Sequence, residues 1–141
     1  PDGGRDILGN GTGNWDCRLD VRKYVSTKDI TAAEFKSVID DNEIVIVDFW
    51  ATWCGPCRAF APTFGASADK HPDIVHAKVD TEAEPELAQA AEIQAIPTLM
   101  AFKKGHQVFR QSGALGPAQL EDLITKIKEF DVDAAIASQQ N

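Results

Sequence analysis

Cys54 and Cys57 are the residues of this sequence whose type and spacing could do chemistry directly. They enclose Gly55 and Pro56, and they follow an apolar segment and precede a predicted helix. The first sulfur would lie at the helix N-terminus, where unsatisfied N–H groups and the helix dipole favour a thiolate. A thiolate is the species that attacks a disulfide, and the second sulfur is close enough to resolve the mixed disulfide. The pattern therefore predicts thiol–disulfide exchange.

The cysteine pair has two other possible interpretations, a zinc site and a structural disulfide. A C-x-x-C pair is half of a zinc site, but such a site needs two more ligands, and neither Cys17 nor the three histidines have a matching spacing. A purely structural disulfide that closes four residues would constrain little of the unfolded chain. A redox pair is the interpretation that the residues favour.

Asp48 is the second candidate, because it interrupts an otherwise apolar and β-branched run, 44–50. A carboxylate in a buried strand is costly unless it is paired or protonated. The alternative is that Asp48 is a polar residue that faces solvent at the end of the strand.

Hydrophobic periodicity predicts the elements that position these residues. A capping box, Thr31 to Glu34, predicts the start of one helix. The last helix has acidic residues in its first turns and lysines near its end, which is the distribution that the helix dipole favours. The predicted order is β-α-β-α-β-α-β-β-α, that is, an α/β fold with a central mixed five-stranded sheet, four flanking helices and one late antiparallel hairpin. The expected strands are 21–25, 44–50, 74–79, 98–102 and 107–111; the expected helices are 31–40, 57–70, 85–91 and 117–130.

The chain of 141 residues has the length of one domain. Residues 1–20 hold five of the ten glycines and little apolar periodicity, so we expect a flexible N-terminal arm, with Trp15 and Cys17 as its notable residues. The predicted domain spans 21–130, and 131–141 are expected to be a frayed C-terminal tail.

The composition limits the function classes. Fourteen basic against 22 acidic residues give a net charge of −8, which argues against nucleic acid or an anionic membrane surface as the main partner. No apolar run approaches the ~18 residues that a membrane-spanning helix needs. The first 20 residues lack the basic start and apolar core of a signal peptide, so the expected location is the cytoplasm. The three histidines and the lysines of the last helix are expected on the solvated surface.

The run VDFWATWCGPC, residues 47–57, closely resembles the active-site segment of the thioredoxin family. The resemblance covers about 21–130 and continues through Pro62, 78–80, 96–98, 102–105 and 113–114. Residues 58–62 and 81–84 are similar to the second-type bacterial thioredoxins, many of which carry an N-terminal zinc ribbon. Because the arm has only Cys17, we expect no metal site within this chain.

The resemblance implies roles for further residues. Asp48 would lie beneath Cys57 as a base, with Lys78 near it, although a lysine taken alone is as often a solvated surface residue. Pro97 would be cis and face the cysteines, rather than a trans proline that begins a strand, and the Ile96 backbone would pair with a substrate peptide. Ser112 stands where a valine is common in the family. The implied apolar collar around Cys54 comprises Trp53, Gly55, Pro56, Ile96, Pro97, Gly113 and Ala114.

The function that the resemblance implies is a protein-disulfide reductase. Its partners would be disulfide-containing proteins and a thioredoxin reductase that uses NADPH; the chain itself would bind no cofactor and would be a monomer. Two alternatives stay open: a thiol oxidase or isomerase on the same fold, and a non-enzymatic thioredoxin-like subunit. The Gly55-Pro56 pair resembles the reducing members.

Overall fold

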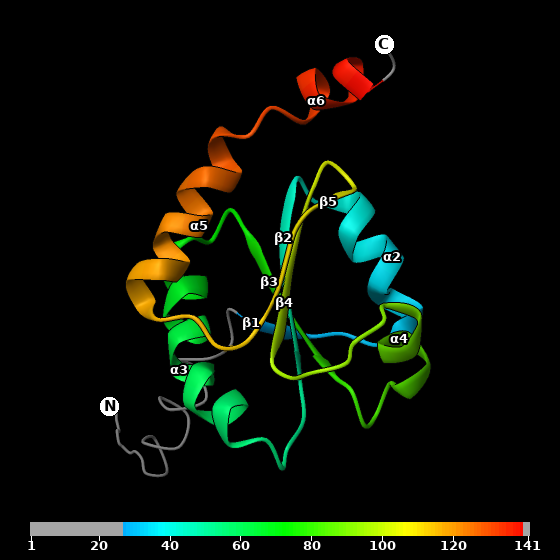
Figure 1. The fold of residues 1–141 in the computed structure, drawn as a ribbon, viewed down its shortest axis with the longest axis vertical. Helices are drawn as coiled ribbons and strands as arrows, with labels where there is room; N and C mark the ends of the chain where they lie inside the picture. Colours follow the sequence, from blue (N-terminus) through cyan, green and yellow to red (C-terminus); the bar gives the residue numbers. More distant parts are fainter. Residues whose placement is uncertain (1–26, 140–141) are drawn as a thin grey trace, which may run out of the picture.

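A computed structural model describes residues 27–139 of the chain. It confirms the predicted α/β fold, with a five-stranded mixed sheet in the order β1-β3-β2-β4-β5 (Figure 1). The strands are β1 (Thr27–Asp29), β2 (Ile44–Trp50), β3 (Val75–Asp80), β4 (Thr98–Lys103) and β5 (His106–Ser112). The helices are α2 (Ala32–Asp41), α3 (Gly55–Lys70), α4 (Pro85–Ala90), α5 (Pro117–Glu129) and α6 (Val132–Gln139).

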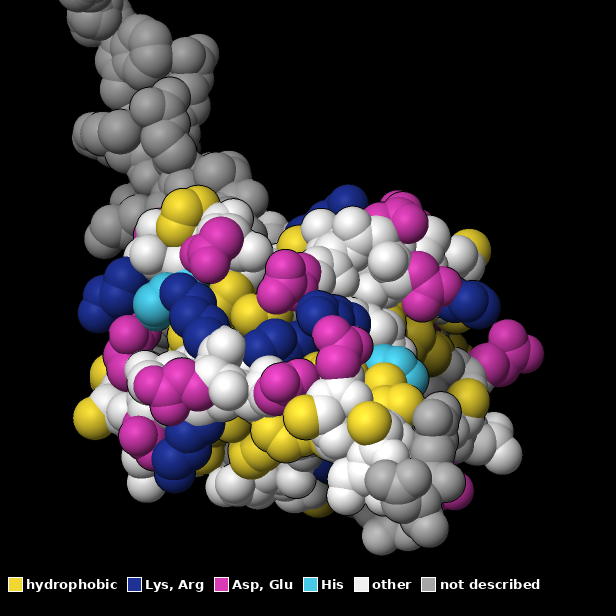
Figure 2. Space-filling model, turned by 90° about the horizontal axis from the view of Figure 1, so that it is seen from above, with side chains coloured by type: hydrophobic (Ala, Val, Ile, Leu, Met, Phe, Trp, Pro, Cys, Tyr) yellow, Lys and Arg dark blue, Asp and Glu magenta, His cyan; other side chains and the backbone are white. Residues whose placement is uncertain are grey.

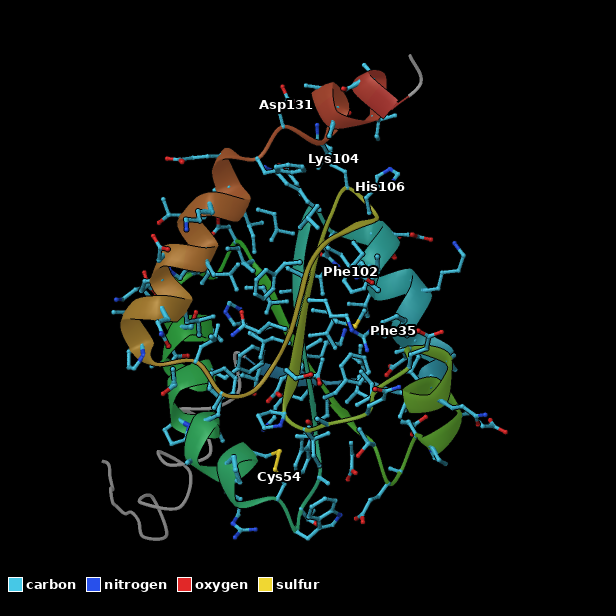
Figure 3. The ribbon with its side chains drawn as sticks, viewed as in Figure 1. Phe35, Cys54, Phe102, Lys104, His106 and Asp131 are labelled. Atoms are coloured by element: carbon cyan, nitrogen blue, oxygen red, sulfur yellow. A yellow bond between two sulfur atoms is a disulfide. The ribbon has the colours of Figure 1, made fainter. Side chains whose placement is uncertain are left out.

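Helices cover both faces of the sheet: α3 and α5 lie on one face, and α2 and α4 on the other (Figure 1). Alternate side chains of β2 point to opposite faces of the sheet and so contribute to two hydrophobic cores. Ile44 and Ile46 pack with α3 and α5, whereas Val45 and Val47 belong to the core on the other face. A strand with both faces buried needs the nearly continuous apolar run that β2 has. Phe35 of α2 and Phe102 of β4 meet edge to face in the second core (Figure 3).

β2 is the central strand, and its register fixes what lies beside Asp48. It pairs in parallel with β3 and antiparallel with β4, which places Asp48 opposite Lys78 on one side and opposite Leu99 on the other. Asp48 is therefore an interior position of the sheet, and the alternative of a solvent-facing strand end is wrong, since its exposed fraction is 1%.

The β4–β5 hairpin turns at Lys104 and Gly105, whose φ angles are 52° and 83°. Two successive positive φ angles are typical of a type I′ turn, whose twist suits a two-residue hairpin. The turn lies at the opposite end of the molecule from Cys54 (Figure 3).

One of the expected boundaries needs correction. Residues 132–139, expected to be part of a frayed tail, form α6, in which Val132 is buried and Asp133 pairs with Lys104 at 2.9 Å. Among residues 27–139 there are therefore five helices, one more than expected. The first described strand is β1, at 27–29; the expected strand at 21–25 and the arm at 1–20 lie outside the described residues.

His76 is a second correction, because it is fully buried in β3 rather than solvated. Its ring packs against Phe64, with ring centroids 5.0 Å apart. Nδ1 lies 3.1 Å from the Ile74 carbonyl oxygen, and Nε2 lies 2.9 Å from Ser67 Oγ. Because a carbonyl can only accept, the neutral ring carries its proton on Nδ1 and accepts from the Ser67 hydroxyl at Nε2.

A buried lysine joins the sheet to α5. The Nζ of Lys103 donates to the carbonyl oxygens of Ile127, Lys128 and Phe130 at 2.7, 2.9 and 2.7 Å. These carbonyls lie at the C-terminus of α5, where the helix leaves acceptors without partners. The ammonium group donates hydrogen bonds to these acceptors, and its positive charge is attracted to the negative end of the helix dipole.

The surface at the α6 end carries acidic and basic side chains side by side, with apolar side chains between them (Figure 2). None of the helices between residues 27 and 139 combines the length and the apolar character that crossing a membrane requires.

We predict that His76 makes the fold sensitive to acid. Burial lowers the pKa of His76 below its ordinary value of 6.5, while the Ile74 carbonyl opposes that shift; of the nearby charged groups, His71 lowers the pKa, and Glu121 and Asp73 raise it. A lowered folded-state pKa means that stability is present above the unfolded-state pKa and is lost as the pH falls towards the folded-state value. In urea unfolding at pH 7.5 and pH 5, His76→Gln should lose less stability on acidification than the wild type.

His106→Gln is the matched control, since His106 is exposed in the hairpin. An equal acid-induced loss of stability in His76→Gln and the wild type would contradict the prediction.

Candidate active site

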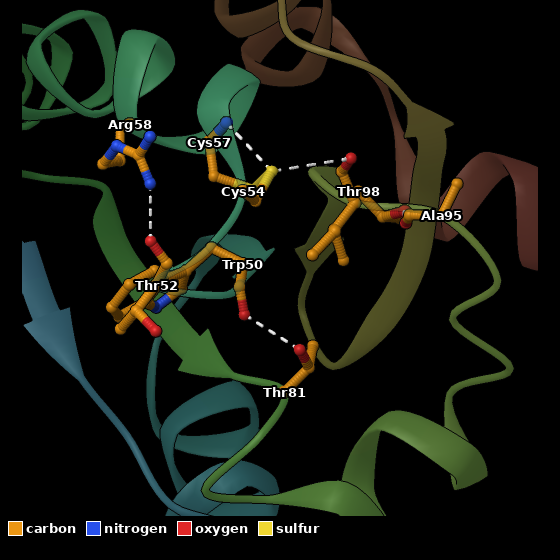
Figure 4. The surroundings of a disulfide bond; sticks show 9 residues. Trp50, Thr52, Cys54, Cys57, Arg58, Thr81, Ala95 and Thr98 are labelled. Atoms are coloured by element: carbon orange, nitrogen blue, oxygen red, sulfur yellow. Dashed lines mark hydrogen bonds between the residues drawn. A yellow bond between two sulfur atoms is a disulfide. The ribbon is translucent and has the colours of Figure 1, made fainter.

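The turn between β2 and α3 brings the two cysteines together in a disulfide, with Cα atoms 5.2 Å apart (Figure 4). Cys54 is the N-cap residue of α3, and its Sγ accepts a hydrogen bond from the Cys57 N–H at 3.1 Å. Gly55 and Pro56 occupy the first helical positions, where the missing N–H of a proline costs no hydrogen bond. The predicted position of Cys54 at a helix N-terminus is therefore confirmed, and the helix begins two residues before the expected Cys57.

The cis proline loop lies beside the sulfur of Cys54. The Ile96–Pro97 peptide bond is cis, as the family resemblance implied, and the Ile96 carbonyl oxygen lies 3.9 Å from Cys54 Sγ. Gly113 joins this loop, because its N–H donates to the Pro97 carbonyl at 2.7 Å and its φ of 103° suits glycine. Ala114 follows as an exposed residue.

An open groove runs past Cys54, between the start of α3 and the segment from α4 to the cis proline. Of the expected collar, Trp53, Gly55, Pro56 and Ile96 line this groove, whereas Pro97, Gly113 and Ala114 do not. Trp53 is 66% exposed, which is unusual for an indole side chain. The groove residues are Trp53, Cys54, Gly55, Pro56, Thr81, Ala88, Ile93, Gln94, Ala95 and Ile96.

The two sulfurs differ in their relation to this groove. Cys54 lines it, whereas Cys57 does not, although both residues are 3% exposed in the disulfide form. Cys57 begins a helix face that continues through the buried Phe60 and Phe64. A substrate in the groove would therefore meet the sulfur of Cys54 first.

Asp48 lies in the interior with no hydrogen-bond partner for either carboxylate oxygen among the described residues. Side chains alternate along β2, and Ile46 packs with Phe60 and Phe64, so Asp48 faces the same helix, α3, that carries Cys57. Burial raises the pKa of Asp48 from 3.8 to about 7, and the charge of Lys78 opposes that shift. Such a carboxyl group can take up and release a proton near neutral pH.

Lys78 is half-buried beside Asp48, as expected, but it donates no hydrogen bond to the Asp48 carboxylate oxygens, which have no partner among the described residues. Its ammonium group lies over the Trp50 ring instead, with Nζ 4.8 Å from the ring centroid. A cation in this position is attracted to the negative face of the ring. Lys78 therefore acts on Asp48 through its charge rather than through a direct contact.

Three features of the site were not predicted from the sequence. Thr81 lines the groove and donates through Oγ1 to the Trp50 carbonyl at 3.0 Å, and Arg58 donates to the Thr52 carbonyl at 2.7 Å (Figure 4). The third is the contribution of α4 through Ala88. Arg58 and Thr81 lie in segments that carry the family resemblance, but the sequence assigned no role to them or to Ala88, because these roles depend on contacts between separate segments. Within residues 27–139, no group of three or more histidine, cysteine or acidic residues could hold a metal ion.

Comparisons with known proteins agree with this geometry. The family model named Thioredoxin matches residues 26–129. A Streptomyces coelicolor protein of the thioredoxin 2 type is 48% identical over 118 residues, which are 82% of this chain and 88% of that protein. A thioredoxin of Mycobacterium tuberculosis is 43% identical over 102 residues, 72% of this chain and 88% of its own length. The structure of a Plasmodium falciparum thioredoxin superposes with a TM-score of 0.67 at 38% identity, over 71% of this chain and 98% of that one.

We predict that Asp48→Ala stabilises the protein near neutral pH. A group whose pKa is raised by folding contributes its stability below the unfolded-state pKa and loses it as the pH rises through the folded-state pKa. For a shift from 3.8 to about 7, the ionised group costs the folded state about 4 kcal/mol at pH 8. Removing the carboxyl group should therefore raise the free energy of unfolding at pH 8 and much less at pH 4.

Urea unfolding of Asp48→Ala, the wild type and the control Asp41→Ala, which alters an exposed carboxyl group, measures this difference at both pH values. If Asp48→Ala is no more stable than the wild type at pH 8, the ionised carboxylate does not destabilise the folded state, which would contradict a raised pKa for Asp48.

Proposed function

The chain belongs to the thioredoxin family, and on that premise we propose that it reduces protein disulfides with Cys54 as the nucleophile and Cys57 as the resolving thiol. Members of this family are thiol–disulfide oxidoreductases, and the Cys54–Cys57 pair is at disulfide distance. The observation that carries the assignment of roles is that Cys54 both caps α3 and lines the groove, whereas Cys57 does neither.

In the first step the Cys54 thiolate attacks one sulfur of a substrate disulfide. A new S–S bond forms between Cys54 and the substrate, and the other substrate sulfur leaves as a thiolate. The Cys57 N–H, at 3.1 Å from Cys54 Sγ, stabilises the negative sulfur, and so does the N-terminus of α3. Both contributions lower the energy of the thiolate relative to the thiol.

In the second step Cys57 loses its proton and attacks Cys54, so that the substrate leaves with its second sulfur reduced. Two electrons then have passed from the dithiol to the substrate, and the Cys54–Cys57 disulfide has formed. Asp48 is the proposed proton acceptor for Cys57, directly or through a water molecule. Its pKa of about 7 supports this role, because a general base works best when its pKa lies near the working pH.

The groove is the proposed binding site for an extended polypeptide segment around the substrate disulfide. Exposed Trp53 supplies an apolar wall, and the Ile96 backbone, next to the cis proline, is the proposed partner of the substrate backbone in a strand-like pairing. The Ile96 carbonyl oxygen lies 3.9 Å from Cys54 Sγ, which supports this proposal, because a peptide paired with Ile96 would present its disulfide to the nucleophile.

The proposed partners are disulfide-containing proteins and a thioredoxin reductase that returns electrons from NADPH to the disulfide. NADPH then takes part only through the reductase, and this chain binds no cofactor. The cytoplasm is the proposed location, since a reducing compartment keeps the Cys54–Cys57 dithiol available.

The direct test is insulin reduction coupled to NADPH oxidation through a thioredoxin reductase. The wild-type chain should support turnover, and the double variant with both cysteines replaced by serine should not. A wild-type chain that leaves insulin disulfides intact, with a reductase that reduces a known thioredoxin, would contradict the proposed function.

We predict that Cys57→Ser accumulates mixed disulfides with substrates through Cys54, because the resolving attack is removed. Cys54→Ser should accumulate none. Both variants are made in a Cys17→Ser background, which excludes disulfides through the third cysteine. Non-reducing electrophoresis and mass spectrometry of captured proteins measure the adducts, and equal capture by the two variants would show that the roles are assigned wrongly.

A further inference from the structure

Arg110 of β5 ties the sheet to the end of α4. Its Nη1 donates to the Ala91 carbonyl at 2.6 Å, and its Nη2 donates to the Glu92 carbonyl at 2.5 Å. The planar guanidinium group thus holds two successive carbonyls with two separate N–H groups. A lysine could not reproduce this fork, because its ammonium group is a single point of charge.

The end of α4 needs such support. Glu92 has a φ of 58°, the left-handed conformation in which a helix commonly ends but which usually falls to glycine. The Glu92 N–H donates to the Gln89 carbonyl at 2.9 Å, and the Ile93 N–H donates to the Ala88 carbonyl at 3.0 Å. These two bonds form a Schellman motif. Arg110 binds the two carbonyls that flank the left-handed residue, Glu92.

The segment that follows this turn is one wall of the active-site groove. Residues 93–96 line the groove together with Cys54, and they end at the cis bond to Pro97. The β4–β5 hairpin flanks this short segment on both sides: β4 begins at Thr98, directly after the cis proline, and Arg110 of β5 binds the carbonyls of Ala91 and Glu92, which precede the segment. Arg110 pairs in register with Met100, a buried residue of β4, so the guanidinium group is anchored on a rigid strand pair.

We propose that Arg110 is a positioning residue for substrate binding: it holds the wall at residues 93–96 in the conformation that receives a polypeptide beside Cys54. This proposal rests on the proposed function, since it concerns the affinity of the same groove for protein substrates. Arg110 does not line the groove and is not a catalytic residue. It acts on substrate through the loop.

Arg110→Gln removes the charged fork and leaves the cysteines and Asp48 untouched. Loss of charge-assisted hydrogen bonds should weaken the binding of a protein substrate by about tenfold. We expect this loss in the KM for insulin, with kcat little changed. Reduction of 5,5′-dithiobis(2-nitrobenzoic acid), a small disulfide that does not need the groove wall, should keep the wild-type rate. Arg110→Lys keeps the charge but replaces the planar fork with a single ammonium group, so its KM for insulin should lie between those of the wild type and Arg110→Gln.

Lys104→Gln is the matched control, because it removes the same charge at the end of the molecule far from Cys54 (Figure 3). An unchanged KM for insulin in Arg110→Gln would overturn the proposal, and so would an equal loss of rate on both disulfides, which would indicate a general structural role. Failure of the proposed function is a separate result, because the wild type itself would then not reduce insulin. If Arg110→Gln does not fold, Arg110→Lys provides the same comparison of KM on the two substrates.

Discussion

The N-terminus of α3 is the constraint on which the site depends. A helix begins there with its first N–H groups unsatisfied, and one of them, from Cys57, points to the sulfur of Cys54 at 3.1 Å. The same hydrogen bond caps the helix in the disulfide and can stabilise a thiolate in the dithiol. The buried β2 strand and the face of α3 that packs on it fix where this helix begins, so the core of the protein sets the chemistry of its sulfur.

At Asp48, in contrast, the feature that supports the proposed function destabilises the fold. Its carboxyl group lies in the centre of the sheet without a hydrogen-bond partner among the described residues, and its pKa of about 7 is a measure of the resulting strain. A leucine or valine would suit the position better by packing alone. A carboxyl group that changes its proton near neutral pH is instead suited to serve Cys57, so the strain and the proposed function have the same cause.

The sequence predicts local features well and contacts between distant segments poorly. The β2 run, the helix after Cys54 and the hairpin turn follow from side-chain pattern, and the family resemblance adds the cis bond before Pro97. His76 was missed, because a lone histidine in an alternating strand carries no sign that Ser67 and Phe64 will surround it. Arg110 was missed for the same reason: its two acceptors are backbone carbonyls, which every sequence has, on another element.

We propose that the start of α3 makes Cys54, and not Cys57, the nucleophile. The most direct measurement is the rate of iodoacetamide alkylation of each cysteine in the reduced protein as a function of pH, resolved by peptide mass spectrometry. We expect Cys54 to be alkylated first, with a midpoint below the ordinary thiol pKa of about 8.5, while Cys57 reacts slowly. A midpoint for Cys54 at or above the ordinary value, or faster alkylation of Cys57, would contradict it.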